Sequence, residues 1–238
     1  MQVNHKFWPL LSLLLLMTSI LKASEEPPFE INRSIWSIGL GGYQNNLKSG
    51  DGNHVLGVSS VVQLGRGYIG DTWFATGAVE FISGPFQSPE QQNLVVDFSG
   101  TGFSTWIGFS AENQNLRTEA GNYGFLLGLN YSDIIGRSVG DRVTNEGGTT
   151  TSNWVMRVNN FTIFPSIFFT WLKPPREKGN SPELLLTRIE GYLLKIGIAA
   201  PLQIRYKVKY DENERKIVRK GELEGYTVMI TFSTLFGA

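Results

Sequence analysis

Along much of the chain, apolar and polar side chains alternate one for one. In Asn122–Asp133 the aromatic and aliphatic residues from Tyr123 to Tyr131 fall on odd positions, with Leu126 as the exception, and glycine and small polar residues fall between them. Successive side chains of a β-strand point to opposite faces, so each set lies on one face of a sheet. The same pattern occurs in Ser34–Tyr43, Phe161–Trp171, Pro201–Tyr210 and Tyr226–Ser233. An all-β fold is therefore predicted.

The strands predicted from this pattern are long. They cover residues 33–43, 55–64, 72–83, 94–110, 121–132, 153–171, 184–199, 202–210 and 216–236. A strand that crosses a bilayer needs about 9–11 residues, whereas the mean strand of a soluble protein has about 5–6. Length therefore favours a membrane barrel. Because bacterial barrels have an even number of strands, we expect about ten, with eight as the alternative.

The two faces of the predicted strands differ in kind. One carries Trp, Phe, Leu and Ile; the other carries glycines and small polar residues. We expect the apolar face to meet lipid and the glycine face to line a narrow barrel. Several apolar faces end in aromatic residues, which predicts girdles at the two membrane interfaces. The candidate girdle residues are Trp73, Phe81, Tyr123, Tyr131, Phe161 and Trp171.

The N-terminus has the pattern of a secretory signal. An apolar stretch from Leu10 to Leu21 follows a short polar start that contains Lys6, and Ala23 precedes the expected cleavage site. The stretch is shorter than the roughly 20 residues of a membrane-spanning helix. We expect residues 1–23 to be a cleaved signal peptide, with an uncleaved anchor as the alternative. Residues 24–32 would form a short periplasmic segment, and 33–238 a single barrel domain.

The signal, the alternation and the aromatic ends together resemble bacterial outer-membrane β-barrel proteins as a structural class, without reaching a specific family. The resemblance implies a closed antiparallel up-and-down transmembrane β-barrel in the cell outer membrane. Its partners would be the lipid bilayer and the outer-membrane assembly machinery. Barrels of this class often end in an aromatic residue that the machinery recognises. Here Phe236 is followed by Gly237 and Ala238, so that signal is displaced.

Composition and charge remove several classes of function. The chain has 21 Lys and Arg residues and 21 Asp and Glu residues, so its formal net charge is zero. No overall positive field would attract nucleic acid. The chain has no Cys, which excludes thiol catalysis, Cys-ligated zinc and redox switching. We expect no cofactor and no metal site.

Charged residues on the predicted strands are candidates for the lumen. Glu80 and Asp97 lie on predicted strands, and the basic candidates, which lie opposite apolar faces, are Lys195, Arg205, Lys207 and Lys209. An Arg or Lys that faces lipid at the bilayer midplane would cost about 2–4 kcal/mol. Paired with the acidic residues, the basic ones would fill the barrel with ion pairs. The alternative is a narrow anion-preferring pore lined by Arg205, Lys207 and Lys209.

Catalytic residues are not expected. The mature chain has one histidine, His54, which could pair with Asp51 in a membrane hydrolase, although a loop histidine in a turn rich in Gly, Asp and Asn is the simpler interpretation. The leading prediction is a small outer-membrane barrel with a structural, surface-contact or transport-related role. The alternatives are a narrow solute channel with a basic lumen and an exported soluble lipid-binding β-barrel. The sequence identifies neither a solute nor an oligomeric state.

Overall fold

The computed structural model describes residues 33–89, 95–111, 116, 121–138, 143–144, 150–172, 189–212 and 215–237. The expected signal peptide (1–23) and periplasmic segment (24–32) lie outside these residues. In the part of the chain that is described, no helix is both long enough and apolar enough to cross a membrane.

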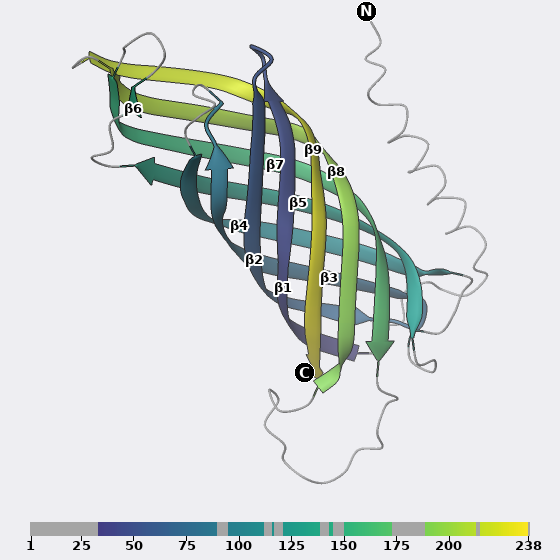
Figure 1. The fold of residues 1–238 in the computed structure, drawn as a ribbon. Helices are drawn as coiled ribbons and strands as arrows, with labels where there is room; N and C mark the ends of the chain where they lie inside the picture. Colours follow the sequence, from purple (N-terminus) through teal and green to yellow (C-terminus); the bar gives the residue numbers. More distant parts are fainter. Residues whose placement is uncertain are drawn as a thin grey trace, which may run out of the picture. The chain divides into compact units, whose positions relative to one another are not determined.

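The described residues form β-strands joined by turns and loops (Figure 1). The strands are β1 (Arg33–Ser49), β2 (His54–Ile69), β3 (Trp73–Gln87), β4 (Val95–Ser110), β5 (Asn122–Ser138), β6 (Val143–Thr144), β7 (Thr150–Leu172), β8 (Ile189–Glu212) and β9 (Arg215–Gly237). Many exceed the length needed to cross a bilayer, and β7, β8 and β9 have 23, 24 and 23 residues. These three strands extend past the β1–β2 hairpin, whose strand β1 is paired with β9 only as far as Ser49 and Leu223.

The strands pair in an antiparallel ring. The described sheet has nine strands in the order β5-β4-β3-β2-β1-β9-β8-β7-β6, and a further pairing joins β5 to β7. Omitting the two-residue β6, which only flanks β7, leaves eight strands that each pair with two neighbours. The fold is a closed up-and-down barrel with the smaller of the two expected strand numbers. The segments 184–199 and 202–210, expected to be separate, belong to the single strand β8.

The inside and the outside of the ring match the predicted faces over most of the chain. On β5, Tyr123, Phe125, Leu129 and Tyr131 are exposed on the outer surface, and alternate residues such as Leu126 are buried. The corresponding rows of β1, β7 and β9 are exposed in the same way. The large exposed residues of these rows include Trp36, Ile38, Leu40, Phe161, Ile167, Trp171, Tyr226, Ile230 and Phe232. An outward belt of this kind is the surface that a barrel presents to lipid.

The predicted orientation of residues 201–210 is wrong. Ile204, Tyr206, Val208 and Tyr210 are buried on the inner face, and the basic residues between them point outward. The reason is a register shift in β8 between Ala199 and Ile204. Odd positions face inward before the shift and even positions face inward after it. A one-residue change of register exchanges the two faces of a strand.

Glycine makes room for large side chains inside the ring. A Cβ atom on Gly128 would lie 2.2 Å from Cζ3 of the Trp106 ring, and one on Gly136 would lie 2.8 Å from Cζ of Phe98. Aromatic side chains fill the space, as in the edge-to-face pair of Phe74 and Phe168 with ring centroids 4.8 Å apart. The glycines on the inner face thus leave the space that the buried aromatic rings occupy.

We predict that Gly128→Ala destabilises the barrel, because the added methyl group would occupy the position of the Trp106 ring. Overpacking of this kind costs about 1–3 kcal/mol. The midpoint of urea unfolding in detergent micelles, followed by tryptophan fluorescence, should fall. Gly50→Ala is the matched control, because its new Cβ would have no atom within 4 Å. Equal midpoints for the two variants would contradict this account of the interior.

Candidate functional site

A buried carboxylate lies at the centre of the described interior. Glu80 on β3 is fully buried, and its oxygens accept three hydrogen bonds from other strands. Tyr43 Oη donates to Oε2 at 2.8 Å, Asn130 Nδ2 donates to the same oxygen at 2.7 Å, and Gln63 Nε2 donates to Oε1 at 2.7 Å. A buried carboxylate is tolerated when its lone pairs are satisfied in this way.

A buried ammonium group completes the cluster. Lys195 on β8 is 3% exposed, and its Nζ donates to Gln63 Oε1 at 3.0 Å. Gln63 therefore connects Lys195 with Glu80, since its amide accepts from one and donates to the other. Lys195 Nζ also lies 4.6 Å from the centroid of the Trp106 ring, within the range of a cation–π interaction. We call Tyr43, Gln63, Glu80, Asn130 and Lys195 the central cluster.

The local sequence explains how long polar side chains fit here. Gln63 and Glu80 are cross-strand partners, and each lies beside a glycine on its other side, Gly39 for Gln63 and Gly102 for Glu80. A Cβ on Gly39 would lie 3.2 Å from Gln63 Oε1. The small neighbours leave space for the carboxylate and amide to lie across the lumen.

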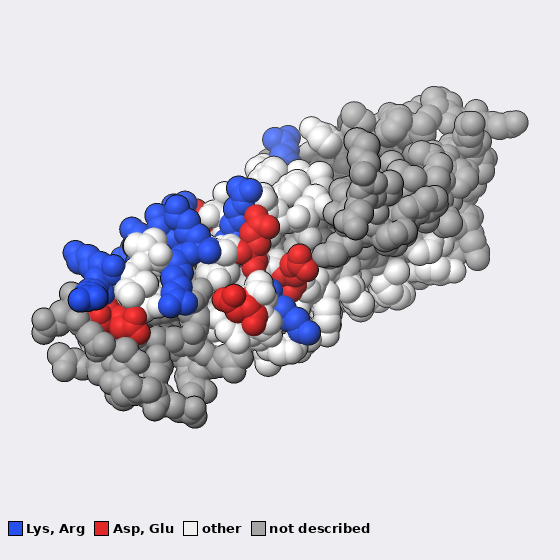
Figure 2. Space-filling view, turned by 90° about the horizontal axis from the view of Figure 1, so that it is seen from above, with Lys and Arg blue, Asp and Glu red and all other residues white. Residues whose placement is uncertain are grey.

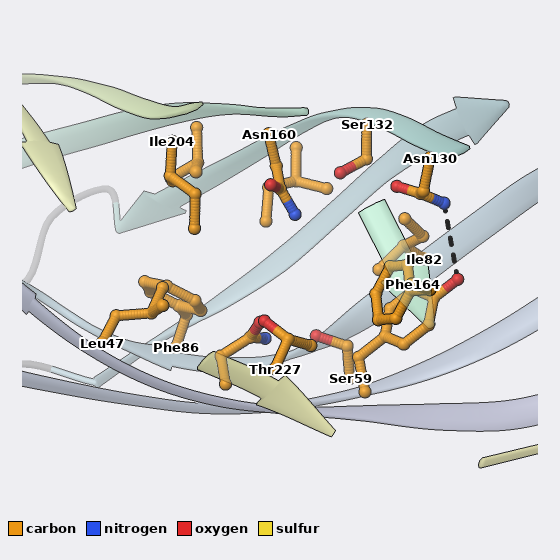
Figure 3. A pocket seen from close by; sticks show the side chains of 14 residues that line it. Leu47, Ser59, Ile82, Phe86, Asn130, Ser132, Asn160, Phe164, Ile204 and Thr227 are labelled. Carbon is orange, nitrogen blue, oxygen red and sulfur yellow. Dashed lines mark hydrogen bonds between the residues drawn. The ribbon is translucent and has the colours of Figure 1, made fainter. Parts of the chain in front are cut away.

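Both sides of the central cluster are packed. On one side lies a cavity of about 20 Å³, which has room for about one water molecule. Figure 3 shows Asn130, Ser132 and Asn160 pointing into it from one wall, with Ser59 and Thr227 opposite. Towards the other end, Ile35, Ile69, Phe74, Leu116, Leu172, Leu193 and Leu235 surround an apolar space of about 10 Å³. Neither of these two cavities has room for more than about one water molecule.

The predicted lumen charges separate into two groups. Glu80 and Lys195 lie inside the ring, where they belong to the central cluster. The prediction is wrong for Asp97, Arg205, Lys207 and Lys209, which are exposed on the outer face. The three basic residues face outward because of the register shift in β8. Asp97 is likewise outward, between the buried Val96 and Phe98.

Five of the six candidate girdle residues lie on the outer surface. Tyr123 and Trp171 lie near one end of the belt, and Tyr131 and Phe161, which are cross-strand partners, lie near the other, as does Phe81. The prediction is wrong for Trp73, which is only 7% exposed. Its ring packs against the turn at Gly70, where a Cβ would come within 2.2 Å of Nε1.

The outward belt holds one charged residue between its two aromatic ends in the described strands. This residue is Arg66, whose guanidinium carbon lies 5.2 Å from the centroid of the Trp36 ring. The aliphatic part of an arginine side chain can lie along an apolar surface while its guanidinium group reaches a more polar medium. The belt thus has the composition expected for contact with acyl chains.

The candidate hydrolase pair is not assembled. His54 is exposed at the start of β2, opposite Lys48 of β1, and Asp51 is exposed in the intervening turn. In this described hairpin, no hydrogen bond joins the two side chains. Among the described residues, no group of three or more His, Cys, Asp or Glu side chains is placed to hold a metal ion.

Four residues around the buried carboxylate were not predicted from the sequence: Tyr43, Gln63, Asn130 and Trp106. A signal for them was nonetheless present. Each has the parity of the glycine face, and Gln63 and Asn130 are the long polar residues on faces that are otherwise small. What the alternation could not provide was the partner of each side chain, since Asn130 and Glu80 come from strands that are not neighbours in the ring.

No family model and no curated protein matches the chain. Among solved structures it is similar to a major outer membrane protein from Thermus thermophilus, with 8% identity and a TM-score of 0.48 over 86% of this chain and 99% of that one. It is similar to the outer membrane protein OprG from Pseudomonas aeruginosa, with 13% identity and a TM-score of 0.48 over 88% and 98%. The outer membrane protein AlkL in DMPC bilayers has 13% identity and a TM-score of 0.34 over 90% and 97%.

We predict that Glu80→Gln strongly destabilises the barrel, because it leaves the Lys195 ammonium buried without a counter-charge. Removal of one partner of a buried pair costs about 3–5 kcal/mol. The double variant Glu80→Gln/Lys195→Met should recover most of that loss in urea unfolding.

The matched control is Glu222→Gln, which breaks the ion pair of Arg205 and Glu222 on the outer face, where both side chains are 64% exposed. It should change the unfolding midpoint little, because exposed pairs contribute little. A double variant as unstable as Glu80→Gln would show that the two charges are not coupled.

Proposed function

We propose that this protein is a small outer-membrane barrel that acts through its outer surface and its membrane-external ends, without conducting solutes along its axis. The observation that supports this is the central cluster. Five side chains from β1, β2, β3, β5 and β8 are hydrogen-bonded to one another across the lumen. A polar path filled by its own side chains gives a solute no continuous chain of sites to enter and leave.

The channel with a basic lumen has less support. Arg205, Lys207 and Lys209, the residues that would line it, point outward. The charge of the central cluster is balanced, with Glu80 and Lys195 connected through Gln63. A balanced and hydrogen-bonded interior favours a structural lumen over an anion-preferring one.

The soluble lipid-binding barrel also has less support. Such a protein would hold its large apolar side chains inside and expose polar ones. Here Trp36, Leu40, Phe125 and Ile230 are among the apolar side chains on the outer surface, between 44% and 63% exposed. A continuous outward belt is stable in hydrocarbon and promotes aggregation in water. The outer membrane is the location that fits an exported barrel with such a belt.

We expect the purified protein to produce no steady conductance in planar lipid bilayers. Glu80→Ala/Lys195→Ala, which removes both charges and shortens both side chains, should also produce no steady current, because the apolar side chains around Phe74 still close the other end of the lumen. Lys207→Ala is the control, since that side chain lies outside the ring and its loss should leave the bilayer silent. Steady ion-selective conductance of the unaltered protein, diminished by Lys207→Ala, would instead support the channel.

A further inference from the structure

Basic residues gather on the outer surface beyond one end of the apolar belt. Figure 2 shows Lys and Arg side chains gathered on one part of the described surface, with Asp and Glu side chains beside and between them. The strand register places six cations and two carboxylates on outward positions of β5, β7, β8 and β9, and Asp211, Lys216 and Glu224 border them on the next outward positions. The six cations and two carboxylates are Arg137, Arg157, Arg205, Lys207, Lys209 and Lys220, with Asp133 and Glu222. We call these eight residues the outer basic patch; its charge is six minus two, or four positive.

The carboxylates of the patch are already engaged. Asp133 accepts hydrogen bonds from Nε of Arg157 at 2.8 Å and from Nη2 of the same residue. Glu222 accepts from Nε of Arg205 at 3.3 Å. Lys207, Lys209 and Lys220 form no ion pair with a carboxylate in the described part of the chain. The two pairs therefore leave the lysines of the patch uncompensated.

Three of the cations lie in one row across the sheet. Arg157 of β7 is paired with Lys207 of β8, and Lys207 is paired with Lys220 of β9. Since neighbouring strands are about 4.8 Å apart, the row spans roughly 10 Å at its base. Like charges directly opposite each other on a sheet are destabilising. An anion that binds between them would remove this repulsion.

The row lies next to the surface that meets acyl chains. On β7, Arg157 is two outward positions beyond Phe161, and Asn159 lies between them. At about 3.3 Å per residue, that distance is roughly 13 Å of tilted strand. The headgroup region of a bilayer adds about 5–7 Å on each side of the hydrocarbon. With Phe161 at the edge of the hydrocarbon, strand tilt brings the row to the level of lipid headgroups or just beyond.

We propose that the outer basic patch binds the phosphate groups of anionic lipids in the leaflet that surrounds this end of the barrel. The lipid chains would lie on the adjoining apolar belt, which includes Phe161 and Leu202. Lys207 and Lys220 offer ammonium groups to phosphate oxygens, and Arg157 retains the guanidinium N–H groups that Asp133 does not use. This inference rests on the proposed function, since it requires the barrel to be inserted in a membrane.

The test measures lipid selectivity directly. The full-length mature protein is inserted in phosphatidylcholine bilayers, and the association of spin-labelled phosphatidic acid relative to spin-labelled phosphatidylcholine is determined by electron paramagnetic resonance. We expect the unaltered protein to prefer phosphatidic acid. In Lys207→Gln/Lys220→Gln the affinity of the patch for phosphatidic acid should fall roughly tenfold or more, because each cation near an anionic lipid raises the affinity about fivefold. Lys207→Arg/Lys220→Arg should retain the preference.

The matched control removes the same charge elsewhere. Lys48 lies opposite Glu224, and Lys216 lies opposite Asp211, so each has a carboxylate as its cross-strand partner. Lys48→Gln/Lys216→Gln should leave the preference for phosphatidic acid close to that of the unaltered protein. An equal loss in both double variants would overturn the proposal, because the effect would then follow net charge alone. An unchanged preference in Lys207→Gln/Lys220→Gln would overturn it as well.

The unfolding midpoint is a second measurement, and we expect Lys220→Gln to change it in opposite directions in two kinds of bilayer. In phosphatidylcholine alone, Lys220→Gln should raise the unfolding midpoint, because it relieves the repulsion with Lys207. In bilayers that contain phosphatidic acid, the same substitution should lower the midpoint, because a phosphate contact is lost. The same sign in both bilayers would overturn the proposal. A protein that fails to enter either bilayer would instead contradict the proposed function, so the two failures are distinguishable.

Discussion

The hydrocarbon of a membrane offers a peptide group no hydrogen-bonding partner, and the closure of this barrel satisfies that constraint. Each unpaired backbone N–H or C=O in lipid costs several kcal/mol, so a sheet can cross only if it has no free edge. The pairing of β1 with β9, from Ile35 with Gly237 to Ser49 with Leu223, removes the last edge. Closure then divides the side chains between two environments, because alternate residues of each strand must face lipid or the interior.

A ring of eight strands has an interior that its own side chains must fill. The protein fills it with aromatic rings set against glycines and with one central group of charges. The charges are tolerated because Glu80 has three donors and Lys195 has both an amide oxygen and the face of Trp106. Gln63 connects the two, and strands distant in the sequence are held in one register by side chains as well as by their backbones.

The apolar residues of β8 alternate with other residues along the whole strand, but they face outward in its first part and inward in its second. Up to Ala199, the apolar residues Leu194, Ile196 and Ile198 face outward, towards lipid. Beyond the register shift, Ile204, Tyr206 and Val208 face inward and Lys and Arg residues face outward. The medium around the strand changes from hydrocarbon to headgroups and water along its length. The register shift between Ala199 and Ile204 exchanges the faces of β8 near this change of medium, whereas β7 keeps its even positions inward from Trp154 to Leu172.

From the alternation alone, the sequence determined that the chain from about Arg33 onward is all-β and that its strands are long enough to cross a bilayer. It also determined that glycines share a face opposite to Trp36, Phe125 and Ile230. These are local properties, because the side-chain period of a strand is set by its own backbone. Only the tertiary structure decided where the faces of β8 exchange, that Trp73 is buried, and that Tyr43, Asn130 and Glu80 meet. Those outcomes depend on strand register and on contacts between residues far apart in the sequence, such as Tyr43 and Asn130, which are 87 positions apart. A local sequence pattern does not indicate which distant side chain lies across the lumen.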